Sequence, residues 1–170
     1  MRKLMRSQWT EFQNTISVMD DKSSPREILS VILSWLRKSP ETFSTGEFSV
    51  YGVNRFLELR EENYPVESSP MRGVEFSHFK KIIEKYSHND IENIARYLRD
   101  TLETLVVVAA DRQCPRCERW GLGVYKNAND GRMAFECRQC GFAVYSDGSI
   151  VGANELTFAS TENLDGIDLI

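Results

Sequence analysis

The chain has 170 residues, of which 41% are hydrophobic and 27% charged, and its formal net charge is −4 at pH 7. This composition excludes a disordered or fibrous chain and is ordinary for a globular protein with one core, or a core and a small satellite. The longest apolar run, LVVVAA at 105–110, is far shorter than the roughly 18 residues of a membrane span. The start, MRKLMRSQWTEFQ, contains no apolar stretch typical of a secretory signal, so we expect a cytoplasmic protein.

The first two thirds of the chain have the periodicity of helices. Apolar residues recur every three or four positions from Met5 to Met19, and the same spacing returns in the later segments. Two capping-box patterns, SPRE at 24–27 and STGE at 44–47, predict helix starts. We expect a bundle of about five helices over residues 1–110, at 5–19, from 24 to near 40, from 44 to about 63, around 79–86, and from 91 to about 110.

All four cysteines lie in one stretch, CPRCERWGLGVYKNANDGRMAFECRQCG at 114–141, as two CxxC pairs with nineteen residues between them. In a reducing cytosol this pattern favours metal or redox chemistry over disulfides. The CPRC pair looks like that of thiol oxidoreductases, but Gly121 and Gly123 weaken the helix that such a site requires. A redox dithiol also leaves Cys137 and Cys140 unexplained. A closed tetrahedral metal site uses all four thiolates.

The residues between and after the cysteine pairs indicate hairpins. GLGVYK and RMAFEC flank a turn at Asp130-Gly131, and FAVYSDGSIVGA has a second turn at Asp147-Gly148.

This segment resembles the zinc-ribbon family, through Cys114, Cys117, Cys137, Cys140 and the hairpin between the pairs. The resemblance implies one structural zinc ion per chain, held by these four residues and without an open position for catalysis. One departure is that Glu118 stands where the first CxxC turn would often carry glycine, as Gly141 does in the second. Iron in a rubredoxin-like cage fits four thiolates as well, and redox-active or unliganded thiols are a further alternative.

These patterns together predict an α+β fold. We expect an N-terminal helical bundle over 1–110, a C-terminal β zinc ribbon over 111–158 and an acidic tail over 159–170. A ribbon of this size has too little core to fold without the metal.

The sequence does not predict an enzyme. It contains no GxSxG, Walker, GxGxxG or HExxH motif. The two histidines, His78 and His88, are expected near opposite ends of a short helix, where surface and capping roles are commoner than catalysis.

The charge pattern helps to decide between binding to nucleic acid and binding to a basic protein. Residues 112–142 carry six basic and three acidic side chains, and a zinc ion with four thiolates would reduce this excess to about +1, which is a weak footprint for nucleic acid. Trp120 is expected to pack the ribbon against the bundle. The alternative is a small platform for stacking bases, formed by Arg116, Arg119, Trp120 and Tyr125.

Acidic residues dominate elsewhere, since residues 143–170 contain five acids and no base. The candidate partner-binding residues lie in a second acidic stretch around Tyr64: Glu58, Glu61, Glu62, Tyr64 and Glu67. Acidic surfaces attract basic protein partners. We therefore expect a protein-binding module, and specifically a bacterial immunity protein that neutralises a nuclease toxin by masking its basic active site. The alternative is a nucleic-acid-associated regulator that uses the ribbon or a bundle helix to contact DNA or RNA.

Overall fold

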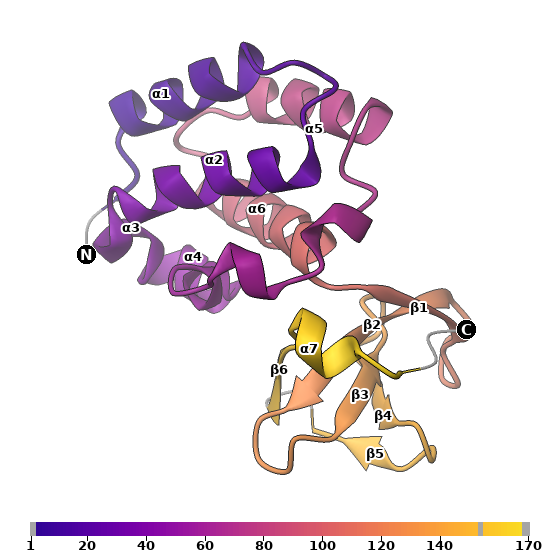
Figure 1. Ribbon diagram of the computed structural model, residues 1–170. Helices are drawn as coiled ribbons and strands as arrows, with labels where there is room; N and C mark the ends of the chain where they lie inside the picture. Colours follow the sequence, from indigo (N-terminus) through magenta and orange to yellow (C-terminus); the bar gives the residue numbers. More distant parts are fainter. Residues whose placement is uncertain (1–2, 153–154, 168–170) are drawn as a thin grey trace. The chain divides into compact units, whose positions relative to one another are not determined.

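The computed structural model describes residues 3–152 and 155–167 and has the expected α+β composition (Figure 1). The described chain divides into two units. Unit 1 contains the residues up to Glu61 together with Ser69–Leu105, and unit 2 contains Glu62–Ser68 together with the residues from Val106 onward. Unit 1 is helical, and unit 2 is built on an antiparallel sheet.

Six α-helices precede the first strand in the described chain: α1 (Arg6–Ser17), α2 (Pro25–Arg37), α3 (Pro40–Phe43), α4 (Gly46–Val50), α5 (Val74–Lys85) and α6 (Ile91–Val106). The predicted capping box before α2 is present, because the Ser24 hydroxyl accepts a hydrogen bond from the Glu27 N–H and the Glu27 carboxylate accepts one from the Ser24 N–H. Short 3-10 turns occupy Val53–Phe56, Glu61–Asn63 and Val66–Ser68.

The helix count differs from the expected five because the predicted helix over 44–63 does not form as one element. Thr45 precedes α4 without a side-chain capping bond, and α4 ends before Gly52, whose φ of 77° is left-handed. A left-handed residue cannot continue an α-helix, so the chain proceeds as 3-10 turns. Pro40 begins the separate short helix α3, and α6 ends at Val106 because Ala109 already belongs to a strand.

The core of unit 1 is rich in aromatic rings. The ring centroids of Phe12 and Trp35 lie 4.2 Å apart in a stacked arrangement, and Phe43 packs against Trp35 at 4.7 Å. Helices α1 and α5 are joined by polar contacts as well, since the Gln13 side-chain amide donates to the backbone oxygens of Ile83 and Tyr86. These bonds satisfy carbonyl groups that the end of α5 leaves without helical partners.

The described residues of unit 2 form one six-stranded antiparallel sheet. Its strands are β1 (Ala109–Gln113), β2 (Trp120–Asn127), β3 (Met133–Glu136), β4 (Ala143–Tyr145), β5 (Ile150–Val151) and β6 (Leu156–Phe158). They are ordered β1-β2-β3-β4-β5, and β6 pairs with the second half of β2. Both predicted hairpins are present, β2-β3 with Gly131 at φ 74° and β4-β5 with Gly148 at φ 84°. A short helix, α7 (Thr161–Leu164), follows β6.

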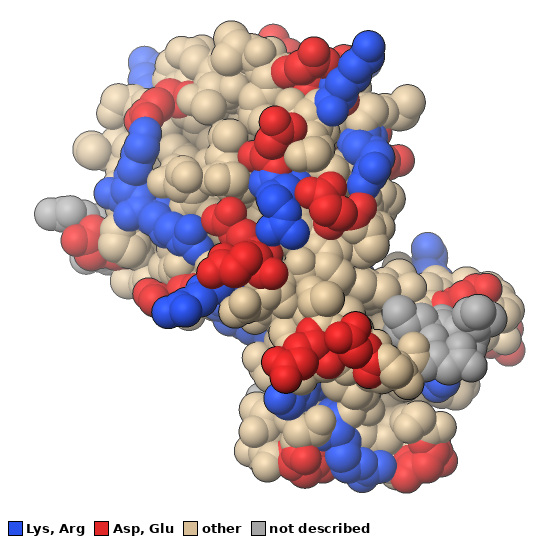
Figure 2. All heavy atoms as spheres, viewed as in Figure 1, with Lys and Arg blue, Asp and Glu red and all other residues tan. Residues whose placement is uncertain are grey.

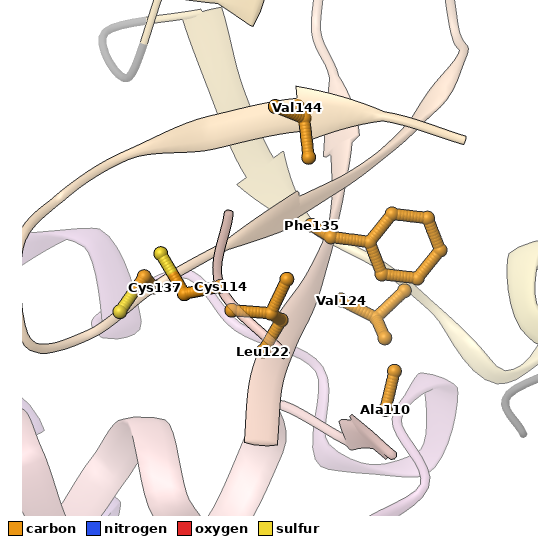
Figure 3. Packing of buried hydrophobic residues seen from close by; sticks show 7 residues of the cluster. All are labelled: Ala110, Cys114, Leu122, Val124, Phe135, Cys137 and Val144. Carbon is orange, nitrogen blue, oxygen red and sulfur yellow. The ribbon is translucent and has the colours of Figure 1, made fainter. Parts of the chain in front are cut away.

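The core of unit 2 reaches the cysteine pairs. Buried side chains from four strands converge in it, and Figure 3 shows Leu122, Val124, Phe135 and Val144 of this cluster together with Cys114 and Cys137. The segment Glu62–Ser68 contributes to the same unit from far away in the sequence. Val66 is fully buried, and the rings of Tyr64 and Phe158 pack edge to face with their centroids 6.5 Å apart.

None of the described helices has both the length and the apolar character that crossing a lipid bilayer would require.

Candidate metal centre

The four cysteines occupy two tight turns at the same end of the sheet of unit 2. The first turn, which we call knuckle 1, holds Cys114 and Cys117 and joins β1 to β2. The second, knuckle 2, holds Cys137 and Cys140 and joins β3 to β4. Because β2 pairs with β3 in register from Gly123 opposite Glu136, the hairpin brings the two knuckles together.

The two knuckles repeat the same backbone hydrogen bonds. In knuckle 1 the Glu118 N–H donates to the Cys114 oxygen at 2.9 Å, and the Cys114 N–H donates to the Arg119 oxygen at 2.8 Å. The corresponding bonds of knuckle 2 run from the Gly141 N–H to the Cys137 oxygen at 2.8 Å and from the Cys137 N–H to the Phe142 oxygen at 2.9 Å. The turns therefore present their sulfur atoms in the same way.

The sulfur geometry fits a tetrahedral metal ion. All four Sγ atoms lie within 4.8 Å of one another, with 3.7 Å between Cys114 and Cys140 and 3.5 Å between Cys117 and Cys137. A tetrahedron with metal–sulfur bonds of about 2.3 Å has edges of about 3.8 Å. All four cysteines are free of disulfides. The group can therefore hold one metal ion with four thiolate ligands.

The electrostatics of the cluster favour a cation at its centre. Burial acts to raise the pKa of the Cys114 thiol, but the N–H groups of Cys117 and Arg116 outweigh it and lower that pKa to about 7. At Cys117 the Arg119 N–H acts to lower the pKa, but desolvation and then the neighbouring sulfurs outweigh it and raise that pKa to about 12. Four like charges this close repel one another, and a divalent cation removes that repulsion.

Gln113 supports knuckle 1 in a way that the sequence patterns did not indicate. Its side-chain amide donates a hydrogen bond to the Glu118 oxygen at 2.9 Å. Arg112 lies over the Phe135 ring, with its guanidinium carbon 4.1 Å from the ring centroid. The only sequence signal for these contacts of Arg112 and Gln113 is that the two residues come just before Cys114.

The expected stacking platform is only partly present on the surface of unit 2. Arg116 and Arg119 are exposed, and Trp120 is 62% exposed instead of packed in a core. Tyr125 is buried at 2% exposure and cannot offer its ring to a base.

The candidate partner-binding residues lie in both units. Glu58 and Glu61 belong to unit 1, where Glu61 forms an ion pair with Arg37 at 3.2 Å. Glu62, Tyr64 and Glu67 belong to unit 2. Glu62 and Glu67 are exposed, whereas Tyr64 is half-buried and burial raises its pKa.

The two histidines lie at separate places in unit 1. His78 is exposed on α5, and His88 lies in the turn between α5 and α6. There it lines a cleft of about 520 Å³ in unit 1, together with Thr42, Glu47 and Glu92. The Glu92 carboxylate in this cleft already accepts hydrogen bonds from the Tyr51 hydroxyl and Arg96.

Comparisons with the sequence models of known protein families, with curated proteins and with solved structures found no significant match to this chain.

Proposed function

We propose that the chain is a non-enzymatic protein-binding module in which one structural zinc ion, held by Cys114, Cys117, Cys137 and Cys140, organises an acidic unit 2 for a basic partner. The zinc part of this proposal is supported by the sulfur geometry, because a closed set of four thiolates is typical of structural zinc. Such a site leaves no position for water or substrate, which argues against metal-assisted catalysis.

Elemental analysis of protein purified without added metal tests the ligand set. We expect about one zinc per chain and loss of that zinc in Cys137→Ser. Iron at the same stoichiometry, with the colour of a rubredoxin-like centre, would replace zinc in this proposal. Four freely reacting thiols and no metal would overturn it.

The observation that carries the protein-binding function is the unequal distribution of charge between the units. Among the described residues, unit 1 has fourteen basic and fourteen acidic side chains, and unit 2 has six basic and ten acidic ones. A zinc ion with four thiolates adds about two more negative charges to unit 2. A surface of this sign attracts basic proteins and repels phosphate backbones.

The acids of unit 2 come from segments that are distant in the sequence. Glu62 and Glu67 precede the sheet, and Glu162 and Asp165 lie in and after α7; all four are exposed. On the face shown in Figure 2, acidic side chains gather over α7, whereas acidic and basic side chains alternate over the helices of unit 1.

The basic partner that we propose is a nuclease toxin, which would make the chain a bacterial immunity protein. An enzyme that cleaves nucleic acid needs a basic surface to bind the phosphate backbone. An acidic protein covering that surface would exclude the substrate. Support for this partner comes from the acidic unit 2 and from the lack of catalytic motifs in the sequence.

A capture experiment with the full chain tests the function class. The zinc-loaded protein is immobilised and exposed to source cytosol with and without nuclease treatment, and bound proteins are identified by mass spectrometry. We expect a basic protein that is retained after nuclease treatment. The captured protein is then assayed for nuclease activity with and without this chain, and a partner whose activity is unchanged would overturn the toxin proposal.

Charge reversal then tests whether unit 2 is the binding surface. Glu62→Lys with Glu162→Lys should slow association with the captured partner about tenfold or more, because exposed charges steer encounter. The matched control reverses two exposed acids of unit 1, Glu47→Lys with Glu84→Lys, and should change the rate much less. Equal effects of the two pairs on the association rate would show that unit 2 is not the binding surface.

One observation favours the alternative function in nucleic-acid binding. The exposed Trp120 stands directly after Arg119, and stacking combined with phosphate contacts is how many proteins hold single strands. Tight, salt-sensitive binding to DNA or RNA that is lost in Arg116→Gln with Arg119→Gln would establish this function in place of the acidic surface.

A further inference from the structure

The four thiols of the metal centre differ greatly in their access to solvent. Cys114 and Cys137 are buried, with 1% and 2% exposure, and they form part of the unit 2 core. Cys140 is half-buried, and Cys117 is exposed. A small oxidant arriving from solution therefore meets Cys117 first.

Two close sulfur–sulfur contacts run from one knuckle to the other. The Sγ of Cys117 is 3.5 Å from that of Cys137, and the Sγ of Cys114 is 3.7 Å from that of Cys140. Each of these pairs takes one cysteine from knuckle 1 and one from knuckle 2. An oxidised Cys117 therefore has a buried sulfur from the other knuckle beside it, which is the arrangement of an attacked and a resolving thiol.

We propose that Cys117 is a site of oxidation by hydroperoxides and that Cys137 resolves the oxidised form, so that a disulfide between the knuckles replaces the metal ion. The proposal extends the metal centre and does not depend on the partner that the protein binds.

The chemistry balances with one hydroperoxide per disulfide. In the metal-loaded protein Cys117 is a thiolate, because a cysteine must be deprotonated to bind the metal ion. This thiolate attacks a peroxide oxygen, the O–O bond breaks, and the leaving hydroxide takes up a proton to become water. The Cys137 thiolate then attacks Sγ of the Cys117 sulfenic acid, the S–O bond breaks, and a second water is formed. The two sulfurs lose two electrons in total, and hydrogen peroxide is reduced to two molecules of water.

Oxidation would release the metal while keeping the knuckles joined. A disulfide removes two of the four thiolate ligands at once, and the remaining Cys114 and Cys140 hold a metal ion far more weakly. The new bond links the β1-β2 turn to the β3-β4 turn, as the metal ion did. A disulfide within either CxxC turn would instead leave the two turns unconnected.

The sequence allows the pairing to be read directly. Arg112, Arg116, Arg119, Arg132 and Arg138 place every cysteine on a different tryptic peptide, namely 113–116, 117–119, 133–138 and the peptide that starts at 139. The full zinc-loaded chain is treated with one equivalent of hydrogen peroxide, blocked with a thiol reagent, and digested without reduction. A chromophoric chelator reports zinc release in parallel.

The expected first product is the peptide 117–119 linked to 133–138, formed together with the release of zinc. The disulfide pairing can be determined with or without bound zinc. A wrong metal assignment would therefore appear as the absence of zinc release, whereas a wrong oxidation site would appear as a link between other peptides. A first disulfide within a knuckle, equal oxidation of all four thiols, irreversible sulfinic acid at Cys117 without a disulfide, or no reaction would each overturn the proposal.

Two matched variants distinguish a specific reaction at Cys117 from a general effect of weaker metal binding. Cys117→Ser and Cys140→Ser each remove one thiolate, but only the second retains the reactive pair. The rate of formation of the first disulfide should fall about tenfold or more in Cys117→Ser and change less than about threefold in Cys140→Ser. Equal rates in the two variants would show that exposure of Cys117 does not direct the reaction.

Discussion

Glu118 and Gly141 occupy equivalent positions in the two knuckles and share a left-handed backbone, with φ of 60° and 69°. Each donates its N–H to the first cysteine of its own turn, at 2.9 Å and 2.8 Å. The turn that aims the sulfurs requires a positive φ at this position, and glycine meets the requirement without steric cost. Among the described residues other than glycine, only Glu118 has a positive φ.

This equivalence predicts opposite effects of two substitutions. Glu118→Gly should stabilise unit 2 by about 1 kcal/mol, and Gly141→Ala should destabilise it by about the same amount, because a Cβ is disfavoured in this conformation. No heavy atom lies within 4 Å of a Cβ built on Gly141, so the cost there is conformational and not a clash. Hydrogen exchange at the amides of Val124 and Phe135 should slow about fivefold in the first variant and accelerate about fivefold in the second.

The outcome would contradict this account if both variants lowered the protection of β2 and β3. In that case the Glu118 side chain would contribute more to knuckle 1 than its backbone conformation costs. The amides of α6 in unit 1 serve as the internal reference, since neither substitution touches that unit.

Metal removal should affect the two units unequally. Chelation, or Cys137→Ser, should loosen the β sheet while most far-UV helicity remains, because the aromatic core of unit 1 contains no residue of the metal centre. Structural zinc in small domains contributes about 10 to 16 kcal/mol at neutral pH, which is more than a core of this size supplies. Circular dichroism and amide spectra before and after chelation measure the effect, and loss of all helicity would contradict it.

The pKa of Asp21 provides a pH test within unit 1. A hydrogen bond from Lys80, followed by one from Ser77, lowers the pKa of this carboxyl below its ordinary value of 3.8. A lowered folded-state pKa contributes stability that is present above the unfolded-state pKa and is lost as the pH falls through the folded-state pKa. The contribution should therefore disappear only in acid, below about pH 4.

Carboxyl titration by NMR measures this shift. In Lys80→Met the pKa of Asp21 should return toward its ordinary value, whereas Lys81→Met should have a smaller effect because Lys81 acts only through weaker charge attraction. The Lys80 ammonium also donates to the Met19 oxygen at 2.9 Å, so its removal loosens the turn after α1. An unchanged Asp21 pKa in Lys80→Met would show that the ion pair does not form in solution.

Local chemistry explains which parts of this fold could be predicted from sequence. The Ser24–Glu27 capping box and the glycines of both hairpin turns each act within a few residues, and all of them lie where the patterns indicated. The assembly of the four cysteines also follows from local turns, because two knuckles at one end of a hairpin must meet.

The features that could not be predicted depend on more than the local sequence. The helix expected over 44–63 has suitable apolar spacing, but the left-handed Gly52 interrupts it, and a glycine in a sequence does not reveal its own φ. Strand β6 has three residues and pairs with β2 from about thirty positions away, so no periodic pattern could have indicated it. Trp120 is exposed although tryptophan is usually buried, which composition alone cannot show.

The segment Glu62–Ser68 leads to the last prediction, because it belongs to the sheet unit although helices flank it on both sides in the sequence. Val66 in this segment and Val53 in unit 1 are both fully buried valines within 3-10 turns. Val66→Ala should cost about 2 kcal/mol and accelerate exchange about thirtyfold at the amides of Val124 and Phe135. The α6 amides of unit 1 should keep their protection in this variant.

Val53→Ala is the matched control, and it should produce the reverse pattern, with faster exchange in α6 and little change in β2 and β3. A second control, Val18→Ala, alters a side chain that is 82% exposed and should change neither unit by more than about 0.5 kcal/mol. If Val66→Ala instead accelerated exchange in α6 as strongly as in β2, the two units would unfold as one, and unit 2 would have no separate stability for the metal ion to supply.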